Sequence, residues 1–197
     1  KIDEGQKSFI EKIEIRGNTK TKDKVIRREL AVLPDERFVH LSPDIPTEGS
    51  WRIAPLLLRW ASVPAHLDPV PNQVDCAESY RLLAADTGIL GAGFSRLLPG
   101  TVIAQHFDRP LAGVLRFHLC LEGDAGAGME IDGFRIPMRQ GHGIVFDQSL
   151  PHSAWHHGRE PRDCLIVDFV PTAEEVALLV RDRGGVTLGP TAGPSRT

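Results

Sequence analysis

Two histidines and one aspartate in this sequence have the residue types and spacing of a metal site. His106 and Asp108 lie two residues apart in the stretch AQHFD, and His152 follows in SLPHSAW. Residues two apart in an extended chain point to the same side, so His106 and Asp108 could reach one ion while His152 arrives from a distant strand. Two imidazoles and one carboxylate are the ligand set of ferrous oxygenases, which leaves positions open for co-substrate and oxygen. We therefore predict an iron site here, although an HxD pair also occurs at many surface and structural positions.

The stretch LRFHLCL is predicted to be a strand with two different faces. Its leucines and phenylalanine share one face, and the opposite face carries Arg116, His118 and Cys120. In one arrangement the leucines lie in the core while Arg116 and His118 lie in water. In the other, helices cover the leucines while Arg116 and His118 line a barrel. The sequence leaves both arrangements open.

Arg162 precedes the apolar strand DCLIVDFV, which puts its guanidinium at the mouth or the inside of a barrel. A buried arginine needs a carboxylate partner, because an uncompensated buried charge costs several kcal/mol. A dicarboxylate co-substrate would supply one in a bidentate geometry that lysine does not copy. The alternative is a surface Arg162 paired with Glu160 or Asp163.

The elements that must position these residues are mostly short strands. From residue 94 onward, short apolar runs are separated by glycine, as in an all-β sandwich or barrel. Asp132 and Gly133 in MEIDGFRI predict a type I′ hairpin turn. Residues 75–87 predict a short amphipathic helix, and Thr172 is a candidate N-cap for a last helix in TAEEVALLVRD.

The first 33 residues differ from the rest of the chain, because all six lysines lie before residue 25. The pattern there predicts a strand, a turn at Gly17 and Asn18, and a charged helix from about Thr21 to Leu30. KIEIRGNTKTKDKVIRREL resembles the opening strand and helix of a POTRA domain of outer-membrane assembly factors. We predict a dispensable, POTRA-like fragment at residues 1–33; the alternative is a plain solvated helix.

Composition and length set the broad class. A chain of 197 residues suits one main domain, which we place at residues 34–182 and follow with a disordered tail at 183–197. A net charge of -3 gives no reason to expect nucleic acid, and no apolar run is long enough to span a bilayer. Three widely spaced cysteines without a CxxC pair favour a reducing compartment, the cytoplasm.

The order of these features resembles the aspartyl/asparaginyl β-hydroxylase family. The resemblance runs over residues 49–171 and rests on GSWRIAPLL, FSxxxPGTxxxxH, LRxHLxL, FDxSxxHxxW and RxxLIVDxxxP. It implies a mainly β fold, a double-stranded β-helix (jelly roll, cupin-like) with flanking helices. It also implies an enzyme that uses Fe(II) and 2-oxoglutarate to hydroxylate a C–H bond, with release of succinate and CO2.

The resemblance implies roles for particular residues. It implies that His106 and His152 bind iron. It implies that Ser95 and Arg162 bind the distal carboxylate of 2-oxoglutarate, and that Arg116 and His118 lie near this co-substrate. Asp108 matches the HxDPxAGxLRxHL pattern of bacterial lipid A hydroxylases, whereas the animal aspartyl hydroxylases have glycine there. This supports Asp108 as a third ligand and leaves the substrate open among small-molecule, carrier-bound, peptidyl and acyl groups.

Two other classes of function remain open at this stage. The chain could be a cupin-like metal enzyme that needs no 2-oxoglutarate. It could also be a non-catalytic interaction module of the cell envelope that uses the POTRA-like start. His142, His156 and His157 are predicted to be surface residues. The oligomeric state is not predicted.

Overall fold

The computed structural model describes residues 19–40, 45–60, 63–108, 113–123 and 125–181 of the chain. The strand and turn predicted before residue 19 and the predicted tail at 183–197 lie outside the described residues. The domain boundaries that involve those segments therefore stay predictions.

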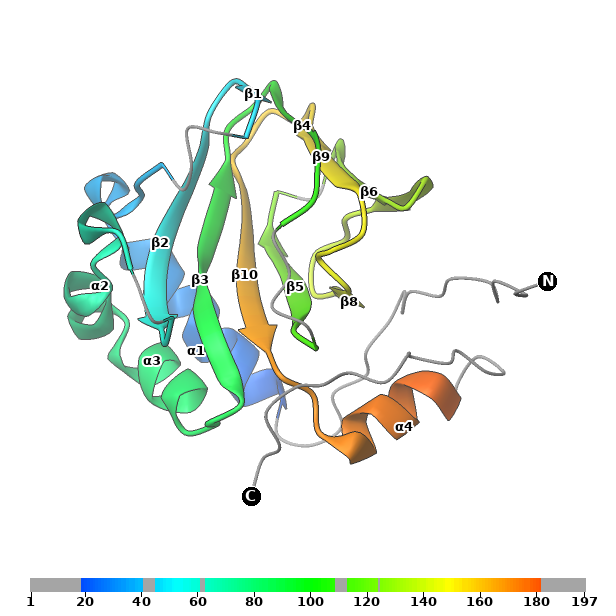
Figure 1. Ribbon diagram of the computed structural model, residues 1–197. Helices are drawn as coiled ribbons and strands as arrows, with labels where there is room; N and C mark the ends of the chain where they lie inside the picture. Colours follow the sequence, from blue (N-terminus) through cyan, green and yellow to red (C-terminus); the bar gives the residue numbers. More distant parts are fainter. Residues whose placement is uncertain (1–18, 41–44, 61–62, 109–112, 124, 182–197) are drawn as a thin grey trace.

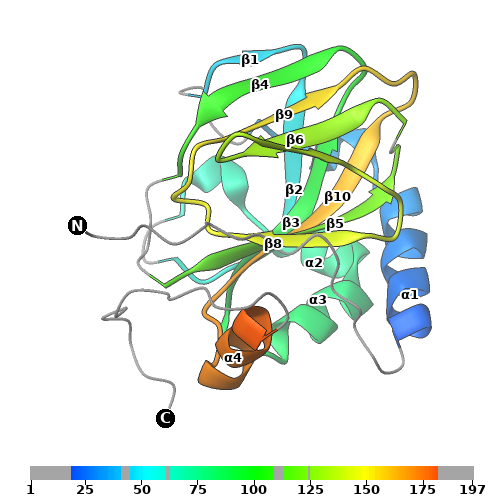
Figure 2. The same cartoon turned by 90° about the vertical axis from the view of Figure 1, so that its right-hand side faces the viewer.

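Ten strands of the described chain form two five-stranded antiparallel sheets that face each other (Figures 1 and 2). The first sheet consists, in spatial order, of β1 (Thr47–Glu48), β4 (Thr101–His106), β9 (His152–His156), β6 (Ala127–Ile131) and β7 (Phe134–Pro137). The second consists of β2 (Trp51–Leu58), β3 (Ile89–Leu97), β10 (Arg162–Phe169), β5 (Leu115–Glu122) and β8 (Gly143–Phe146). Neighbouring strands come from distant parts of the chain, as in a jelly roll. The predicted mainly β, cupin-like fold with flanking helices is confirmed.

Helices cover the second sheet on the side away from the first sheet (Figure 1). They are α1 (Thr19–Val32), α2 (Val70–Asp75) and α3 (Ala77–Ala84), while α4 (Ala173–Arg181) follows β10. Short 3-10 turns occupy Asp35–Arg37 and Ala65–Leu67. The predicted cap of α4 is confirmed: Glu175 N donates to Thr172 Oγ1 at 3.2 Å, and Thr172 N donates to Glu175 Oε2 at 2.6 Å, which is a capping box.

The turn between β6 and β7 has the predicted hairpin geometry. Ile131 pairs with Phe134, so two residues form the loop. Asp132 has φ 49° and Gly133 has φ 83°, and a type I′ turn requires a positive φ at both positions. The prediction is confirmed, and the turn fixes the register in which β6 pairs with β7.

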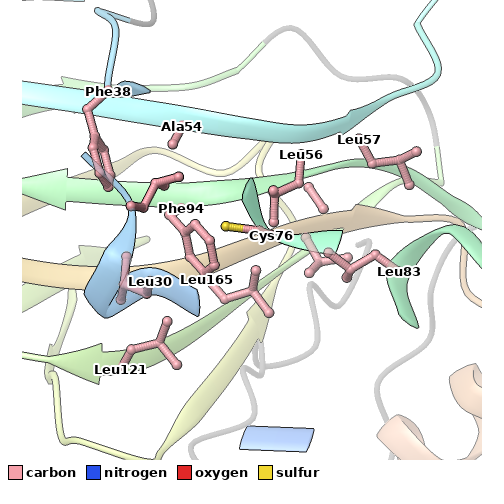
Figure 3. Packing of buried hydrophobic residues seen from close by; sticks show 13 residues of the cluster. Leu30, Phe38, Ala54, Leu56, Leu57, Cys76, Leu83, Phe94, Leu121 and Leu165 are labelled. Atoms are coloured by element: carbon pink, nitrogen blue, oxygen red, sulfur yellow. The ribbon is translucent and has the colours of Figure 1, made fainter. Parts of the chain in front are cut away.

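The two faces of β5 meet different surroundings. Phe117, Leu119 and Leu121 belong to the hydrophobic cluster between the second sheet and the helices, part of which Figure 3 shows. Cys120 belongs to the cluster between the two sheets. The helices therefore cover the apolar face of β5, and Arg116 and His118 point into the barrel. This decides between the two arrangements that the sequence left open.

Helix α1 packs on the barrel more closely than an appended fragment would. Leu30 is 2% exposed and lies among residues of the second sheet that include Phe94 and Leu165 (Figure 3). Glu29, also buried, accepts hydrogen bonds from the backbone N–H groups of Glu78 and Ser79 and from the Ser79 hydroxyl. Its carboxylate thereby satisfies N–H groups at the start of α3. The described part of α1 is thus part of the main core.

Candidate active site

The three predicted metal ligands lie together where β4 ends and β9 begins. His106 ends β4, His152 begins β9, and the two residues are paired directly across the strands. Their ring centroids are 4.3 Å apart. One ligand atom from each of His106, Asp108 and His152 lies within 4.8 Å of the others. The antiparallel pairing of β4 with β9 therefore does what the sequence spacing alone could not, since it brings His152 beside the HxD pair.

Backbone carbonyl groups fix the orientation of both imidazoles. Nδ1 of His106 lies 2.8 Å from the Ala104 carbonyl oxygen, and Nδ1 of His152 lies 2.8 Å from that of Leu150. A carbonyl oxygen only accepts hydrogen bonds, so Nδ1 carries the proton in each ring and Nε2 has the free lone pair. Burial lowers the pKa of His152, which favours the neutral form that binds metals. This arrangement is typical of metal-binding histidines.

The third candidate ligand, Asp108, is held by Arg116. Arg116 Nη1 donates to Asp108 Oδ2, and Asp108 Oδ1 lies 3.9 Å from His106 Nε2. One carboxylate oxygen is therefore held by the arginine while the other faces the two histidines. Arg116 is itself held by Asp168, whose two oxygens accept from Nε at 2.7 Å and Nη2 at 2.9 Å. Burial opposes the charge on Arg116, but Asp168 and Asp108 outweigh that effect and raise its pKa.

Arg162 is buried in the barrel and has no counter-ion among the residues that the structure describes. Its side chain is 1% exposed, and Nε and Nη1 have no hydrogen-bond partner among the described residues. His118 is similarly buried, with both ring nitrogens unpartnered within the same part of the chain. Burial, together with the charges of Arg116 and Arg162, lowers the pKa of His118 well below its usual value, so this imidazole is neutral. These unpaired groups form a socket whose fixed charge is positive.

Ser95 and two aromatic side chains connect this socket to the metal cluster. Trp51 Nε1 donates to Ser95 Oγ at 3.1 Å, which leaves the Ser95 hydroxyl proton available to another acceptor. The Trp51 ring lies 6.5 Å from the His106 ring. On the other side, Phe146 makes edge contacts with His118 at 5.4 Å and with His152 at 5.3 Å. The socket and the cluster are therefore parts of one site between the sheets.

Strand register places the remaining site residues in rows on the inner face of the second sheet. Residues of β10 that point inward are paired with residues of β3 on one side and of β5 on the other. The rows are Ser95–Cys164–Cys120, Gly93–Ile166–His118 and Gly91–Asp168–Arg116. Arg162 is two residues before Cys164 on the same face, so it lies at the opposite end of β10 from Asp168.

All seven residues singled out from the sequence occur at this site, but their contacts differ. His106, Asp108 and His152 cluster as expected, and Arg162 is buried rather than on the surface. Arg116 contacts Asp108 and Asp168, an arrangement that the sequence did not suggest. Asp168 was missed, and the signal available for it was its alternation with Arg162 along β10.

The prediction for the other histidines is wrong at His156. Its side chain is 0% exposed, and Nε2 lies within hydrogen-bonding distance of the Glu160 carbonyl oxygen. His142 and His157 are exposed, as predicted. His156 points inward because it alternates with His152 and Ala154 along β9, and the strand pairing keeps all three on the inner face.

The donors present fit ferrous iron and a dicarboxylate. Two Nε2 lone pairs and one carboxylate oxygen converge, as that metal requires in oxygenases. A small dicarboxylate could bind the metal at one end and supply the missing partner of Arg162 at the other. The buried guanidinium and the available Ser95 hydroxyl are donors suited to its far carboxylate.

The fold and the site together define a class of protein. It is a jelly roll with a cluster of two histidines and one carboxylate inside the barrel. The chain belongs to the Aspartyl/Asparaginyl beta-hydroxylase family, whose family model matches residues 20–171. The match includes α1 from Lys20 onward, in agreement with the packing of that helix.

Similar proteins come from bacteria and animals. An "Ornithine lipid ester-linked acyl 2-hydroxylase" of Rhizobium tropici is 31% identical over 108 residues, which cover 53% of this chain and 38% of that protein. An "Aspartate beta-hydroxylase domain-containing protein 2" of Homo sapiens is 34% identical over 116 residues, which cover 52% of this chain and 31% of that protein. The chain thus matches less than two fifths of the length of these relatives.

Among solved structures, the chain is similar to a "predicted oxalate decarboxylase" of Thermotoga maritima, with 17% identity and a TM-score of 0.44 over 68% of this chain and 99% of that chain. It is also similar to a Cupin_2 domain of a transcriptional regulator from Enterobacter cloacae, with 16% identity and a TM-score of 0.42. That match covers 62% of this chain and 98% of that chain. Within the described residues, no helix combines the length and the apolar character needed to cross a bilayer.

Proposed function

We propose that this chain is the catalytic domain of an Fe(II)- and 2-oxoglutarate-dependent dioxygenase that hydroxylates a C–H bond of its substrate. The observation that carries the proposal is the buried Arg162, whose Nε and Nη1 find no partner in the described part of the barrel. The same barrel holds the His106, Asp108 and His152 cluster. A guanidinium is costly to bury unless an anion joins it. Membership of the hydroxylase family supports the same reaction type.

The chain's own residues bind and orient the reactants in this proposal. His106, Asp108 and His152 hold the iron through Nε2, Oδ1 and Nε2. Arg162 and Ser95 hold the far carboxylate of 2-oxoglutarate, and the neutral His118 lies beside it. When bound, iron and 2-oxoglutarate supply the oxidising power that inserts one atom of dioxygen into the substrate, with succinate and CO2 as by-products.

The protein also supplies a fixed electrostatic environment. Arg116, held at two points by Asp168, keeps one oxygen of Asp108 away from the metal position and so presents the other oxygen to it. The apolar side chains between the sheets exclude water around these groups. Such exclusion strengthens the electrostatic interactions inside the site and protects a reactive centre from side reactions.

The names of two relatives refer to different kinds of substrate. The name of the Rhizobium protein describes action on an acyl chain, and the name of the human protein refers to aspartate hydroxylation. We propose an amino-acid, peptidyl or acyl substrate, small or carrier-bound. A cupin-like metal enzyme without 2-oxoglutarate would share the metal cluster but would leave the buried Arg162 without a role.

Anaerobic titration of the purified chain with Fe(II) and 2-oxoglutarate tests the proposal. We expect a visible metal-to-ligand charge-transfer band that is lost in His152→Ala and weakened in Arg162→Ala. The matched control is Arg135→Ala, because Arg135 is exposed and pairs with Glu130 on the rim. A folded, iron-loaded chain without such a band would refute the proposal, and succinate release coupled to turnover would separate it from other cupin chemistry.

A further inference from the structure

A cavity of about 550 Å³ adjoins the metal cluster, and the candidate ligand Asp108 forms part of its wall. Its walls come from β2, β3 and the segment after β2, and they include Trp51, Ile53, Leu58, Trp60 and Leu67. A volume of this size is typical of sites for small organic ligands. The site therefore has room for a substrate beside the candidate metal position.

The polar residues of this cavity are gathered at one end. They are Asp108, Arg116, Gln148 and Asp168. Arg116 contacts both carboxylates, and the Gln148 carbonyl oxygen accepts from the Asp108 N–H at 3.1 Å. All other described lining residues are apolar or glycine. The cavity thus runs from the candidate metal ligand at one end into an apolar groove.

Trp60 and Gly91 form a wall of this groove beside the polar end. Gly91 is paired with Asp168 across the strands. A Cβ atom on Gly91 would lie 3.0 Å from Trp60 Nε1 and 3.4 Å from two carbons of the same indole, so the indole packs closely against the glycine. A larger residue at position 91 would push the indole into the groove. The pair therefore sets how wide the groove is.

We infer that this groove binds an extended aliphatic chain of the substrate and brings a carbon of that chain to the Asp108 end. The inference rests on the proposed function and names its substrate class. An aliphatic chain loses no hydrogen bonds when it enters an apolar groove. A peptide would bury backbone N–H and C=O groups there, and each unmatched group costs free energy that the described apolar lining does not return.

The test is a calorimetric titration of the metal-free chain with saturated N-acyl glycinamides that lengthen by one methylene at a time. Each buried methylene contributes about 0.8 kcal/mol, so the affinity should rise about fourfold per methylene until the groove is full and then level off. The heat-capacity change of binding should become more negative in step. The head group is neutral, so that binding does not depend on the Arg162 socket.

Two variants act on the wall and one serves as a control. Gly91→Val should make the affinity level off at a shorter chain and weaken the longest ligand at least tenfold. Trp60→Ala should weaken long chains by a similar factor without crowding any backbone. Trp155→Ala is the matched control, because Trp155 lies on the outer face of β9 under Arg135, and it should bind as the parent does.

Three results would overturn the inference. They are an affinity independent of chain length, unchanged binding in both wall variants, and peptide amides of equal apolar area that bind as tightly as the acyl ligands. Because no iron or 2-oxoglutarate is present, the result is separable from the proposed function. If the acyl ligands bind but no charge-transfer band forms, the oxygenase proposal is refuted and the groove is not. If the band forms but the acyl ligands do not bind, only the groove is refuted.

Discussion

Asp168 holds Arg116 at two points, with hydrogen bonds of 2.7 Å from Nε and 2.9 Å from Nη2. The same guanidinium donates to Asp108, so a carboxylate on β10 controls a candidate metal ligand that follows β4. Bidentate pairs of this kind fix orientation as well as charge. Asp168 and Arg116 therefore help to set the position of Asp108 in the candidate site.

Asp168→Asn should weaken Fe(II) binding about 10-fold to 100-fold, as is usual when a partner of a metal ligand is lost. The amide keeps the size of the side chain but loses one acceptor and the charge that hold Arg116. Equilibrium titration with Fe(II) under anaerobic conditions measures the effect. Asp35→Asn is the control, since Asp35 also contacts two arginines but is exposed. Equal affinities in the two variants would mean that Asp168 does not position the ligand.

His106→Ala and His152→Ala should each abolish iron-dependent turnover, because each removes one of the two proposed nitrogen ligands. Metal content after dialysis and product formation measure the effect together. His142→Ala, at an exposed position, should behave as the parent chain does. Full activity in either of the first two variants would remove the ligand assignment.

Arg162→Met should weaken the binding of 2-oxoglutarate by about 2 to 5 kcal/mol, the usual effect of breaking a desolvated charge pair. The concentration of 2-oxoglutarate that the enzyme requires should rise accordingly. The same change should leave the free energy of unfolding of the ligand-free chain unchanged or increased, since it removes a buried charge whose Nε and Nη1 have no partner in the described structure. Co-substrate titration and urea denaturation measure the two effects. A large loss of stability with an unchanged co-substrate requirement would show that Arg162 is structural.

Replacing His118 should make the stability of the metal-free chain less sensitive to acid. The pKa of His118 is lowered in the folded chain, first by burial and then by nearby cations, so below about pH 6.5 the unfolded chain binds a proton that the folded chain does not. Stability is therefore lost as pH falls below that value, by up to about 1.4 kcal/mol per pH unit for this group. His118→Phe should remove this part of the slope between pH 7 and about 5 in urea denaturation. An identical slope in both chains would contradict a neutral, buried imidazole.

Leu30→Ala in α1 should cost about 2 to 5 kcal/mol of unfolding free energy, as expected for a leucine truncated in a packed core. Leu30 is 2% exposed, whereas Val32 on the same helix is 71% exposed, so Val32→Ala is the matched control. Chemical denaturation compares them.

Deleting residues 1–32 should destabilise the fold for the same reason. A deletion variant as stable as the full chain would restore the view of this segment as a dispensable fragment.

Local patterns in the sequence were sufficient for several elements. The alternation in LRFHLCL separates two faces, Asp132 and Gly133 specify their turn, and Thr172 specifies the start of α4, because each depends only on neighbouring residues. The HxD spacing likewise puts His106 and Asp108 on the same side of an extended chain. Such features need no knowledge of distant parts of the chain.

The tertiary structure alone decided which face of β5 lines the barrel, that α1 belongs to the core, and that Arg116 binds Asp108 and Asp168. A period of two defines two faces of a strand but does not say which one meets the other sheet. Ion pairs between Arg116 and residues of other elements depend on strand register, which long-range packing sets. The sequence therefore determined which side chains share a face, and the folded barrel determined which of them meet.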